Sequence, residues 1–265
     1  MTDLFIYEIR GIQAKAVKYI LLLAITGITY DPASAQNNKT TTGHIVNVSL
    51  EISDISDTYL SLYSEKFLST GLAYTFLTSN AFHKKQLSLS WEKGNSKSDK
   101  DPVNVNNISF QFVNGFSVLK NKNTPVNYYV GYHISANPCF IKSRELYSWT
   151  TLNSLSLYNS VVYSHNKSKI SFDLVIPFAG LASRPDGSES YSGDINEMLY
   201  NSYSGLTFTS IHNLKAIDAS LLYGQDLTKR LRLQAGFSFS FKELNTGYLF
   251  TERTYRINTG LSYRL

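Results

Sequence analysis

One stretch near the C-terminus decides the fold: Leu231-Arg232-Leu233-Gln234-Ala235-Gly236-Phe237-Ser238-Phe239-Ser240-Phe241. Its odd-numbered residues are apolar, and its even-numbered residues are small or polar. Because successive side chains of a β-strand point to opposite faces, this alternation predicts a strand with one apolar and one polar face. The run exceeds the roughly 5 or 6 residues of an ordinary strand and matches the roughly 9 to 11 that cross a bilayer when tilted.

The same alternation recurs along the chain from residue 36 onward. Further apolar rows stand at Leu87–Trp91, Ile108–Phe112, Ile170–Phe178 and Tyr255–Leu265, several with Tyr or Trp near an end, as in the aromatic girdles of membrane barrels. Since lipid offers no partner for free backbone groups, membrane-spanning strands must close into a barrel. We therefore expect an all-β, transmembrane antiparallel β-barrel of about 10–12 strands. A secreted or periplasmic β-sandwich, which also alternates, is the alternative.

The composition narrows the classes of function. The chain has 265 residues, of which 43% are hydrophobic and 17% charged, too apolar for a disordered protein. Its net charge of +5 comes from scattered Lys and Arg, so we expect no nucleic-acid partner. Outer-membrane lipid or lipopolysaccharide is the expected partner for this charge. The lone Cys139 excludes an intrachain disulfide, and because Cys and His at zinc-ligand spacing are absent, we expect no metal and no cofactor.

The first 35 residues have the order of a secretory signal peptide. Lys15 and Lys18 precede an apolar run from Tyr19 to Ile28, and Ala33-Ser34-Ala35 follows as a small-residue cleavage site. The apolar run is shorter than the roughly 20 residues of a transmembrane helix. We predict that residues 1–35 are a cleaved signal peptide and that residues 36–265 form the barrel domain.

Two C-terminal stretches resemble outer-membrane β-barrel proteins of the Bacteroidota type. One is Leu227-Thr228-Lys229-Arg230-Leu231-Arg232-Leu233-Gln234-Ala235-Gly236-Phe237-Ser238-Phe239, and the other is Ile257-Asn258-Thr259-Gly260-Leu261-Ser262-Tyr263-Arg264-Leu265. The resemblance implies an outer-membrane location and a last strand that presents a signal to the barrel-assembly machinery. Leu265 stands where such proteins usually end in Phe, so that signal depends on Tyr263 and the alternation.

One pair of residues has a catalytic pattern. His133 and Ser135 are two residues apart and therefore share a face of one predicted strand. Lipid-hydrolysing outer-membrane barrels use a His-x-Ser pair, in which the imidazole activates the hydroxyl. Here Ala136 replaces the Asn that usually follows, and the pair shares its face with Gly131, which indicates the lumen. We favour lumen-filling polar side chains over a catalytic pair, because such short matches are weak.

The alternation also assigns residues to the two faces of the barrel wall. We expect Phe172, Leu174, Phe237 and Phe239 to face lipid. Charged residues on the polar faces line a pore or, as we favour, form ion pairs in a filled lumen. They are Glu92, Asp173, Asp218, Arg232, Lys242 and Arg256.

Turn residues between the rows predict the connections. Ile211-His212-Asn213 has the composition of a short turn, and Gly94–Pro102, Asn137–Trp149 and Ser183–Leu199 that of longer loops. Short turns and both termini should be periplasmic, and long loops external. Counting strands back from the C-terminus puts the 183–199 segment on the periplasmic side. Either one strand is miscounted or this segment is a periplasmic exception, and a plug is possible.

These patterns predict an integral outer-membrane β-barrel without enzymatic activity, acting as a small or occluded pore or as a structural or assembly component. The alternatives are an outer-membrane lipid hydrolase that uses His133 and Ser135, and the secreted or periplasmic binding sandwich.

Overall fold

The computed structural model describes residues 40–265 apart from 60–61, 81, 97–102, 119–124, 144–145, 186–199 and 204. The predicted signal peptide lies outside the described residues. The described chain is almost entirely strand, with one helical turn at 200–203. None of its helices is long and apolar enough to cross a membrane. The strands are β1 Thr41–Asp57, β2 Leu62–Ser79, β3 His83–Ser96, β4 Val103–Ser117, β5 Val126–Ser143, β6 Leu146–His165, β7 Ser168–Ser183, β8 Thr207–Ser210, β9 Leu214–Asp226, β10 Leu231–Asn245 and β11 Leu249–Arg264.

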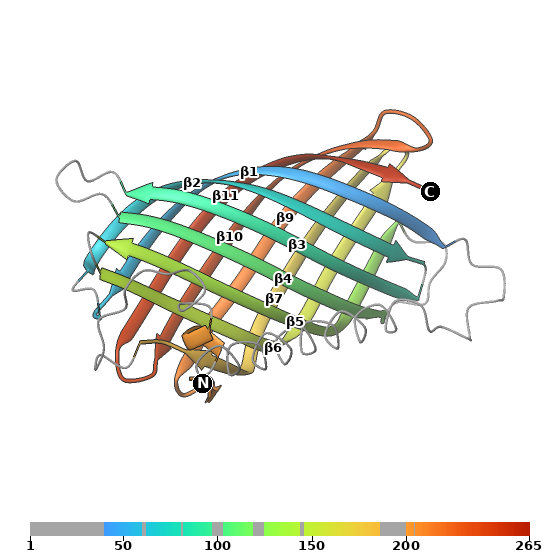
Figure 1. Cartoon of the computed structure of the whole chain (residues 1–265). Helices are drawn as coiled ribbons and strands as arrows, with labels where there is room; N and C mark the ends of the chain where they lie inside the picture. Colours follow the sequence, from blue (N-terminus) through green and yellow to red (C-terminus); the bar gives the residue numbers. More distant parts are fainter. Residues whose placement is uncertain are drawn as a thin grey trace, which may run out of the picture. The chain divides into compact units, whose positions relative to one another are not determined.

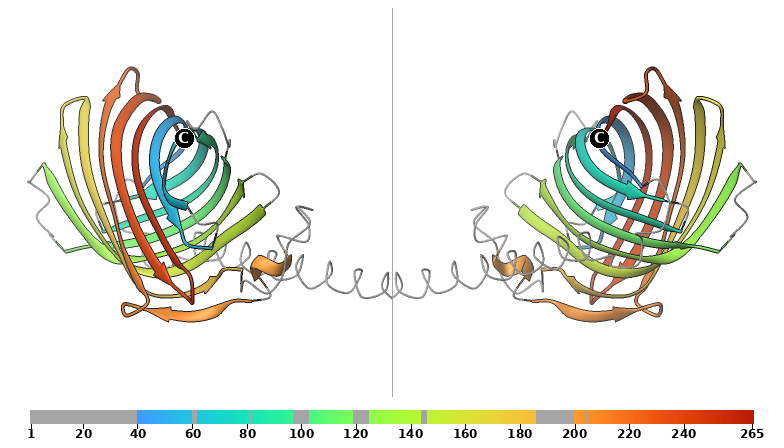
Figure 2. Two further views of the ribbon diagram at one scale, coloured as in Figure 1. Left: turned by 90° about the vertical axis from the view of Figure 1, so that its left-hand side faces the viewer. Right: turned by 90° about the vertical axis from the view of Figure 1, so that its right-hand side faces the viewer.

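The strands close into one antiparallel barrel (Figure 1). Closure is made by β1 and β11, which pair continuously from Gly43↔Arg264 to Asp57↔Phe250. The views along the barrel show the strands surrounding a single interior (Figure 2). Closure confirms the predicted barrel and excludes a two-layer sandwich. We call the end where β1 begins and β11 ends the proximal end, and the opposite end the distal end.

The segment at residues 211–213 corrects one prediction. It forms a turn, but it does not reverse the chain, because β8 and β9 both run antiparallel to β7. The two strands thus share one position in the wall, which leaves ten positions for eleven strands. The chain therefore leaves β7 at the distal end after Ser183. Of the two explanations for the 183–199 segment, the structure supports the miscounted strand, because β8 and β9 occupy one position in the wall. Residues 186–199, including any plug, lie outside the described residues.

A second correction concerns the predicted loop Asn137–Trp149. Its residues up to Ser143 complete β5, and those from Leu146 onward begin β6. The two strands pair without interruption from Val126↔Tyr163 to Ser143↔Leu146. Pro138 is accommodated within β5, where it pairs with Thr151. The composition of the segment is typical of a loop, but its backbone follows the register of the neighbouring strands.

The outer face of the proximal and middle part of the barrel is an apolar belt. Its large side chains are half exposed, between 47% and 64%, although almost all of them are aliphatic or aromatic. A surface of this kind is stable in contact with hydrocarbon and costly in contact with water. Its members include Val46, Val48, Leu50, Ile52, Leu72, Leu89, Trp91, Leu157, Leu221, Phe237 and Ile257.

The polarity of the two faces inverts near the distal end. On the outer face the belt gives way to a charged ring made of Asp54, Lys66, Lys93, Lys142, Lys215, Glu243 and Arg253. Cross-strand pairing holds parts of this ring together, because Asp54 is opposite both Lys66 and Arg253, and Lys215 Nζ lies 2.6 Å from Glu243 Oε1.

The inner face inverts at the same level. The neighbours in sequence of many ring residues point inward and are apolar, as in Asp54–Ile55, Lys66–Phe67 and Lys215–Leu214. Together they form a buried cluster, the apolar seal, which consists of Ile55, Phe67, Val103, Val105, Cys139, Ile141, Leu152, Ala182, Leu214, Leu244 and Phe250. The barrel is thus apolar outside and polar inside over its proximal and middle part, and polar outside and apolar inside at its distal end.

Candidate functional site: the barrel lumen

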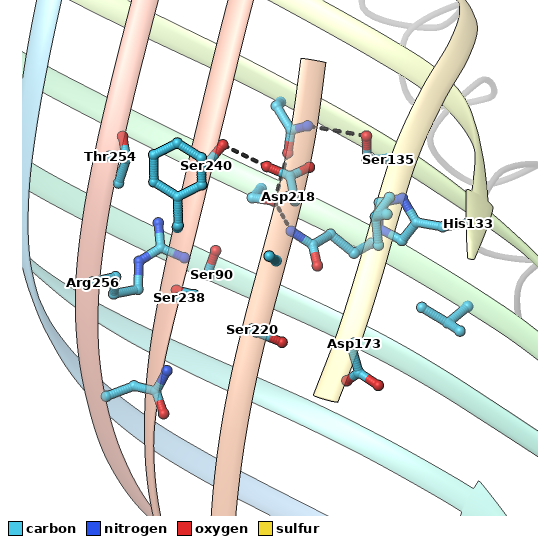
Figure 3. A pocket seen from close by; sticks show the side chains of 18 of the residues that line it. Ser90, His133, Ser135, Asp173, Asp218, Ser220, Ser238, Ser240, Thr254 and Arg256 are labelled. Carbon is cyan, nitrogen blue, oxygen red and sulfur yellow. Dashed lines mark hydrogen bonds between the residues drawn. The ribbon is translucent and has the colours of Figure 1, made fainter. Parts of the chain in front are cut away.

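A central cavity of about 260 Å³ occupies the middle of the lumen. Small polar side chains from most of the strands line it, because the even-numbered serines of β9 and β10 and the odd-numbered residues of β4 and β5 point inward. Figure 3 shows Ser240 directed at Asp218, to which it donates a hydrogen bond, and Arg256 extending into the cavity. Small residues on this face leave space that larger ones would fill.

Ion pairs cross the lumen at the distal side of this cavity. The Arg256 guanidinium lies between two carboxylates, with Nη2 2.6 Å from Glu51 Oε2 and 2.6 Å from Glu92 Oε1. Lys242 Nζ lies 2.9 Å from Glu252 Oε2. Side chains held by opposite charges across several strands fix the register of the wall and reduce the free cross-section.

The proximal side of the cavity is crossed by a second polar cluster. Lys84 Nζ donates to Tyr158 Oη at 2.5 Å and to Asp173 Oδ1 at 3.1 Å, and it lies 3.3 Å from Ser160 Oγ. The Lys84 side chain is 8% exposed, so the pair with Asp173 is largely removed from water. We call these four side chains the lysine crossbar.

A second cavity of about 250 Å³, the proximal vestibule, lies on the other side of the crossbar. Its lining includes Thr41, Ser79, Ser164 and Arg264, which stand at strand ends and show that it is at the proximal end. Arg232 Nε and Arg264 Nη2 both lie 2.5 Å from the same Asp226 oxygen, Oδ1.

At the distal end the described side chains of the apolar seal fill much of the lumen. A cavity beside the apolar seal measures about 10 Å³. It is lined by Leu152, Leu244 and Phe250 together with Lys242 and Glu252. This is about the space of one water molecule. An ion would have to lose its hydration shell to enter such an apolar constriction.

A buried ion pair caps the seal. Arg184 Nη2 binds Asp57 Oδ1, and the two side chains are 1% and 0% exposed. Asp57 also accepts hydrogen bonds from Ser148 Oγ at 3.1 Å and from the Tyr59 backbone N–H at 2.9 Å. Arg184 donates to the Tyr248 carbonyl at 2.9 Å and stacks on Phe250 at 5.2 Å. The pair thus ties together the distal ends of four parts of the wall: β1, β6, β7 and the β10–β11 turn.

The structure places the six predicted charged residues on the inner face, but most of their ion pairs are formed with residues outside this set. Among the predicted residues only Glu92 and Arg256 pair with each other. The other partners are Glu51, Lys84, Asp226 and Glu252, which sequence reasoning missed. The sequence does contain a signal for these four residues, because each stands on the same alternating face of its strand as the small polar residues. The partner of each charged residue depends on the register between strands, and the alternation within one strand does not give that register.

The predicted His133–Ser135 pair is not assembled. Both side chains are buried in the lumen, at 5% and 3% exposure. Ser135 Oγ lies 2.8 Å from Ser154 Oγ and accepts a hydrogen bond from Asn137 Nδ2 at 3.0 Å. His133 Nδ1 is buried and has no hydrogen-bond partner. The hydroxyl is therefore engaged with other groups, and none of the described residues binds Nδ1 of the imidazole to orient it for catalysis.

The four predicted lipid-facing residues lie on the outer face. Phe172 and Phe237 are 45% and 47% exposed, and Leu174 and Phe239 are half-buried against their neighbours. Within the described ranges, no group of three or more His, Cys, Asp and Glu side chains is arranged to hold a metal ion.

A closed antiparallel sheet with a half-exposed apolar belt and a polar lumen is the construction of bacterial outer-membrane proteins. This chain is an integral outer-membrane β-barrel. No family model matches it, and no curated protein matches it in sequence.

Solved structures of similar shape are outer-membrane barrels. The outer membrane protease OmpT from Escherichia coli is 7% identical, with a TM-score of 0.49 over 87% of this chain and 98% of that one. The translocator domain of the autotransporter NalP from Neisseria meningitidis is 10% identical, with a TM-score of 0.41 over 97% of both chains. The COG4313 outer membrane channel from Pseudomonas putida F1 is 10% identical, with a TM-score of 0.41 over 89% of this chain and 100% of that one. At such identities the likeness concerns the fold and not the activity.

Proposed function

We propose that the protein is a non-enzymatic outer-membrane barrel with an occluded lumen, which acts as a structural or assembly component and not as an open pore. The observation that carries this proposal is the apolar seal, which crosses the interior where a channel would need a wet path. The Asp57–Arg184 pair closes the same end. The engagement of Ser135 with Ser154, together with the unpartnered Nδ1 of His133, argues against a lipid hydrolase.

Planar-bilayer recording of the purified protein tests occlusion, and we expect no steady unitary conductance. Replacing Leu152 and Leu244 together by Ser should wet the seal and produce measurable conductance. Leu233→Ser on the outer face is the matched control and should stay silent. A large, steady conductance of the unmodified protein would refute the proposal. If neither the unmodified protein nor Ser135→Ala hydrolyses phospholipid, that result supports the proposal that the protein is not an enzyme.

The surroundings of the barrel follow from the same proposal. The connection after β7 is long and leaves from the distal end, so we propose that the distal end faces outward and the proximal end faces the periplasm. The expected partners are outer-membrane lipid and lipopolysaccharide around the belt, and the barrel-assembly machinery at the last strand, β11. The resemblance to the Bacteroidota type belongs to this proposal as well.

Export by a cleaved signal peptide completes the proposal. The order Lys15/Lys18, Tyr19–Ile28 and Ala33-Ser34-Ala35 predicts cleavage after Ala35. Mass spectrometry of the protein isolated from outer membranes should find Gln36 as its first residue. A protein that keeps residues 1–35 in the membrane would contradict the signal-peptide interpretation.

A further inference from the structure

The proximal vestibule carries more positive than negative charge. Its lining includes Lys84, Lys169, Arg232 and Arg264. The carboxylates that pair with these cations are Asp173, which binds Lys84, and Asp226, which Arg232 and Arg264 share through a single oxygen. Four cations against two carboxylates leave an excess of two positive charges.

Among the four cations of the vestibule, Lys169 has no counter-ion in the part of the chain that the structure describes. In the described part of the chain, no carboxylate lies within ion-pair distance of its ammonium group. Lys84, Arg232 and Arg264 repel its ammonium group, and Asp173 attracts it. Because the surrounding wall has a low dielectric constant and lipid lies outside it, this field is poorly screened and attracts anions into the vestibule.

The strand register around Lys169 places the Arg232 side chain on the same part of the wall. Lys169 is directly opposite Gly224 on β9 and Ser164 on β6. A Cβ at Gly224 would meet Arg232 Cδ at 2.8 Å, so the Arg232 side chain passes over this glycine. Lys169 and Arg232 thus stand beside the same glycine and line one cavity of about 250 Å³. Cations that share so small a cavity suit a compact anion and not an extended one.

Hydroxyl groups complete the lining. Thr41, Ser171 and Ser262 point into the vestibule beside the cations and can donate hydrogen bonds. Arg, Lys and hydroxyl donors are the groups that proteins use to hold phosphate oxygens. The vestibule volume of about 250 Å³ exceeds the space that a phosphate group needs, so a small organic substituent fits as well.

We propose that the proximal vestibule binds a compact dianion of the phosphate class, either inorganic phosphate or a small phosphate monoester, which enters from the proximal end. The excess of two positive charges matches the two negative charges that such a group carries at neutral pH and above. A phospholipid headgroup is a diester with one negative charge on its phosphate and matches less well. The apolar seal makes the vestibule and the central cavity a dead end, so the ligand is held and not conducted.

Isothermal titration calorimetry of the purified full-length protein in a non-ionic detergent tests the proposal. The titrants are inorganic phosphate, glycerol 3-phosphate, succinate and chloride at low ionic strength and about pH 7, where a phosphate monoester is largely a dianion. We expect saturable binding of the two phosphates, weaker binding of succinate, whose charges are spread apart, and no saturable binding of chloride. Binding should weaken as salt is added. Mixed micelles that contain phosphatidylglycerol test whether a lipid headgroup is the ligand instead. We expect that they do not compete with phosphate.

Two variants locate the site. Lys169→Gln and Arg264→Gln should each lower the affinity for phosphate by about tenfold or more, since each removes a charge-assisted contact. Lys169 has no pair to lose, and Asp226 keeps Arg232 when Arg264 is replaced, so both variants should fold. Retention of the compact form in unheated gel electrophoresis checks this. Lys215→Gln, in the charged ring on the distal outer face, is the matched control and should bind as tightly as the unmodified protein.

The opposite results would overturn the proposal. These are no binding of phosphate, an equal loss of affinity in Lys215→Gln, unchanged affinity in Lys169→Gln, or displacement of phosphate by phosphatidylglycerol. None of these results tests whether the lumen is occluded. The vestibule and the apolar seal lie at opposite ends of the lumen, and conductance is measured in a separate experiment.

Discussion

Asp57→Ala is expected to destabilise the barrel by about 3–5 kcal/mol, the usual cost of removing one partner of a buried ion pair. The substitution leaves the Arg184 guanidinium buried at the distal end with no carboxylate beside it. Ser148 Oγ and the Tyr59 backbone N–H lose their acceptor as well. The loss should appear as a lower urea midpoint for unfolding of the protein in detergent, followed by tryptophan fluorescence.

A double substitution separates the ion pair from the packing around it. Asp57→Leu combined with Arg184→Met removes both charges and keeps apolar volume at the end of the seal, so it should recover most of the lost stability. If the single variant Asp57→Ala costs less than about 1 kcal/mol, the pair is hydrated and the distal end is not sealed as described.

Phe237→Arg is expected to cost about 2–4 kcal/mol, because it places a charge in the lipid-facing belt near the middle of the bilayer. Phe237 is 47% exposed on the outer face of β10, between Leu221 of β9 and Ile257 of β11. The neighbouring substitution Ser238→Arg is the matched control. Its side chain enters the polar central cavity, with Arg256 directly opposite and the Asp218 carboxylate diagonally across, and it should cost less than a charge placed in lipid.

Equilibrium unfolding of both variants in lipid vesicles measures the difference. A lipid-phase label attached at Cys in place of each residue gives an independent check, since position 237 should react and position 238 should not. Equal costs for the two arginines, or labelling of position 238 in preference to 237, would show that the faces of the wall are assigned the wrong way round.

The strand pattern was predictable because it is local. The alternation of Phe237, Phe239 and Phe241 with Ser238 and Ser240 depends only on the period of a strand, and lipid on one side requires every spanning strand to repeat it. From this followed the closed barrel and the range of strand numbers, both of which the structure confirms. The turn at 211–213 was predicted as a turn, but turn composition does not say whether the chain reverses there.

The pairing of the lumen charges could not be predicted in the same way. Arg256 meets Glu51 across the seam where the two ends of the sheet join, a contact between residues 205 positions apart. Such contacts depend on barrel closure and on the register of each strand pair, which are properties of the whole sheet.

The sequence by itself determined that the chain is a membrane barrel and which residues share a face of each strand, because strand periodicity and the demands of lipid act residue by residue. Only the tertiary structure decided where the lumen is open and where it is closed. Ile55, Phe67, Leu214 and Leu244 are ordinary apolar residues in sequence, and they become a seal because the register brings them to one level of the interior. Lys169 is left without a counter-ion for the same reason, since the register places Gly224 and not an acid opposite it.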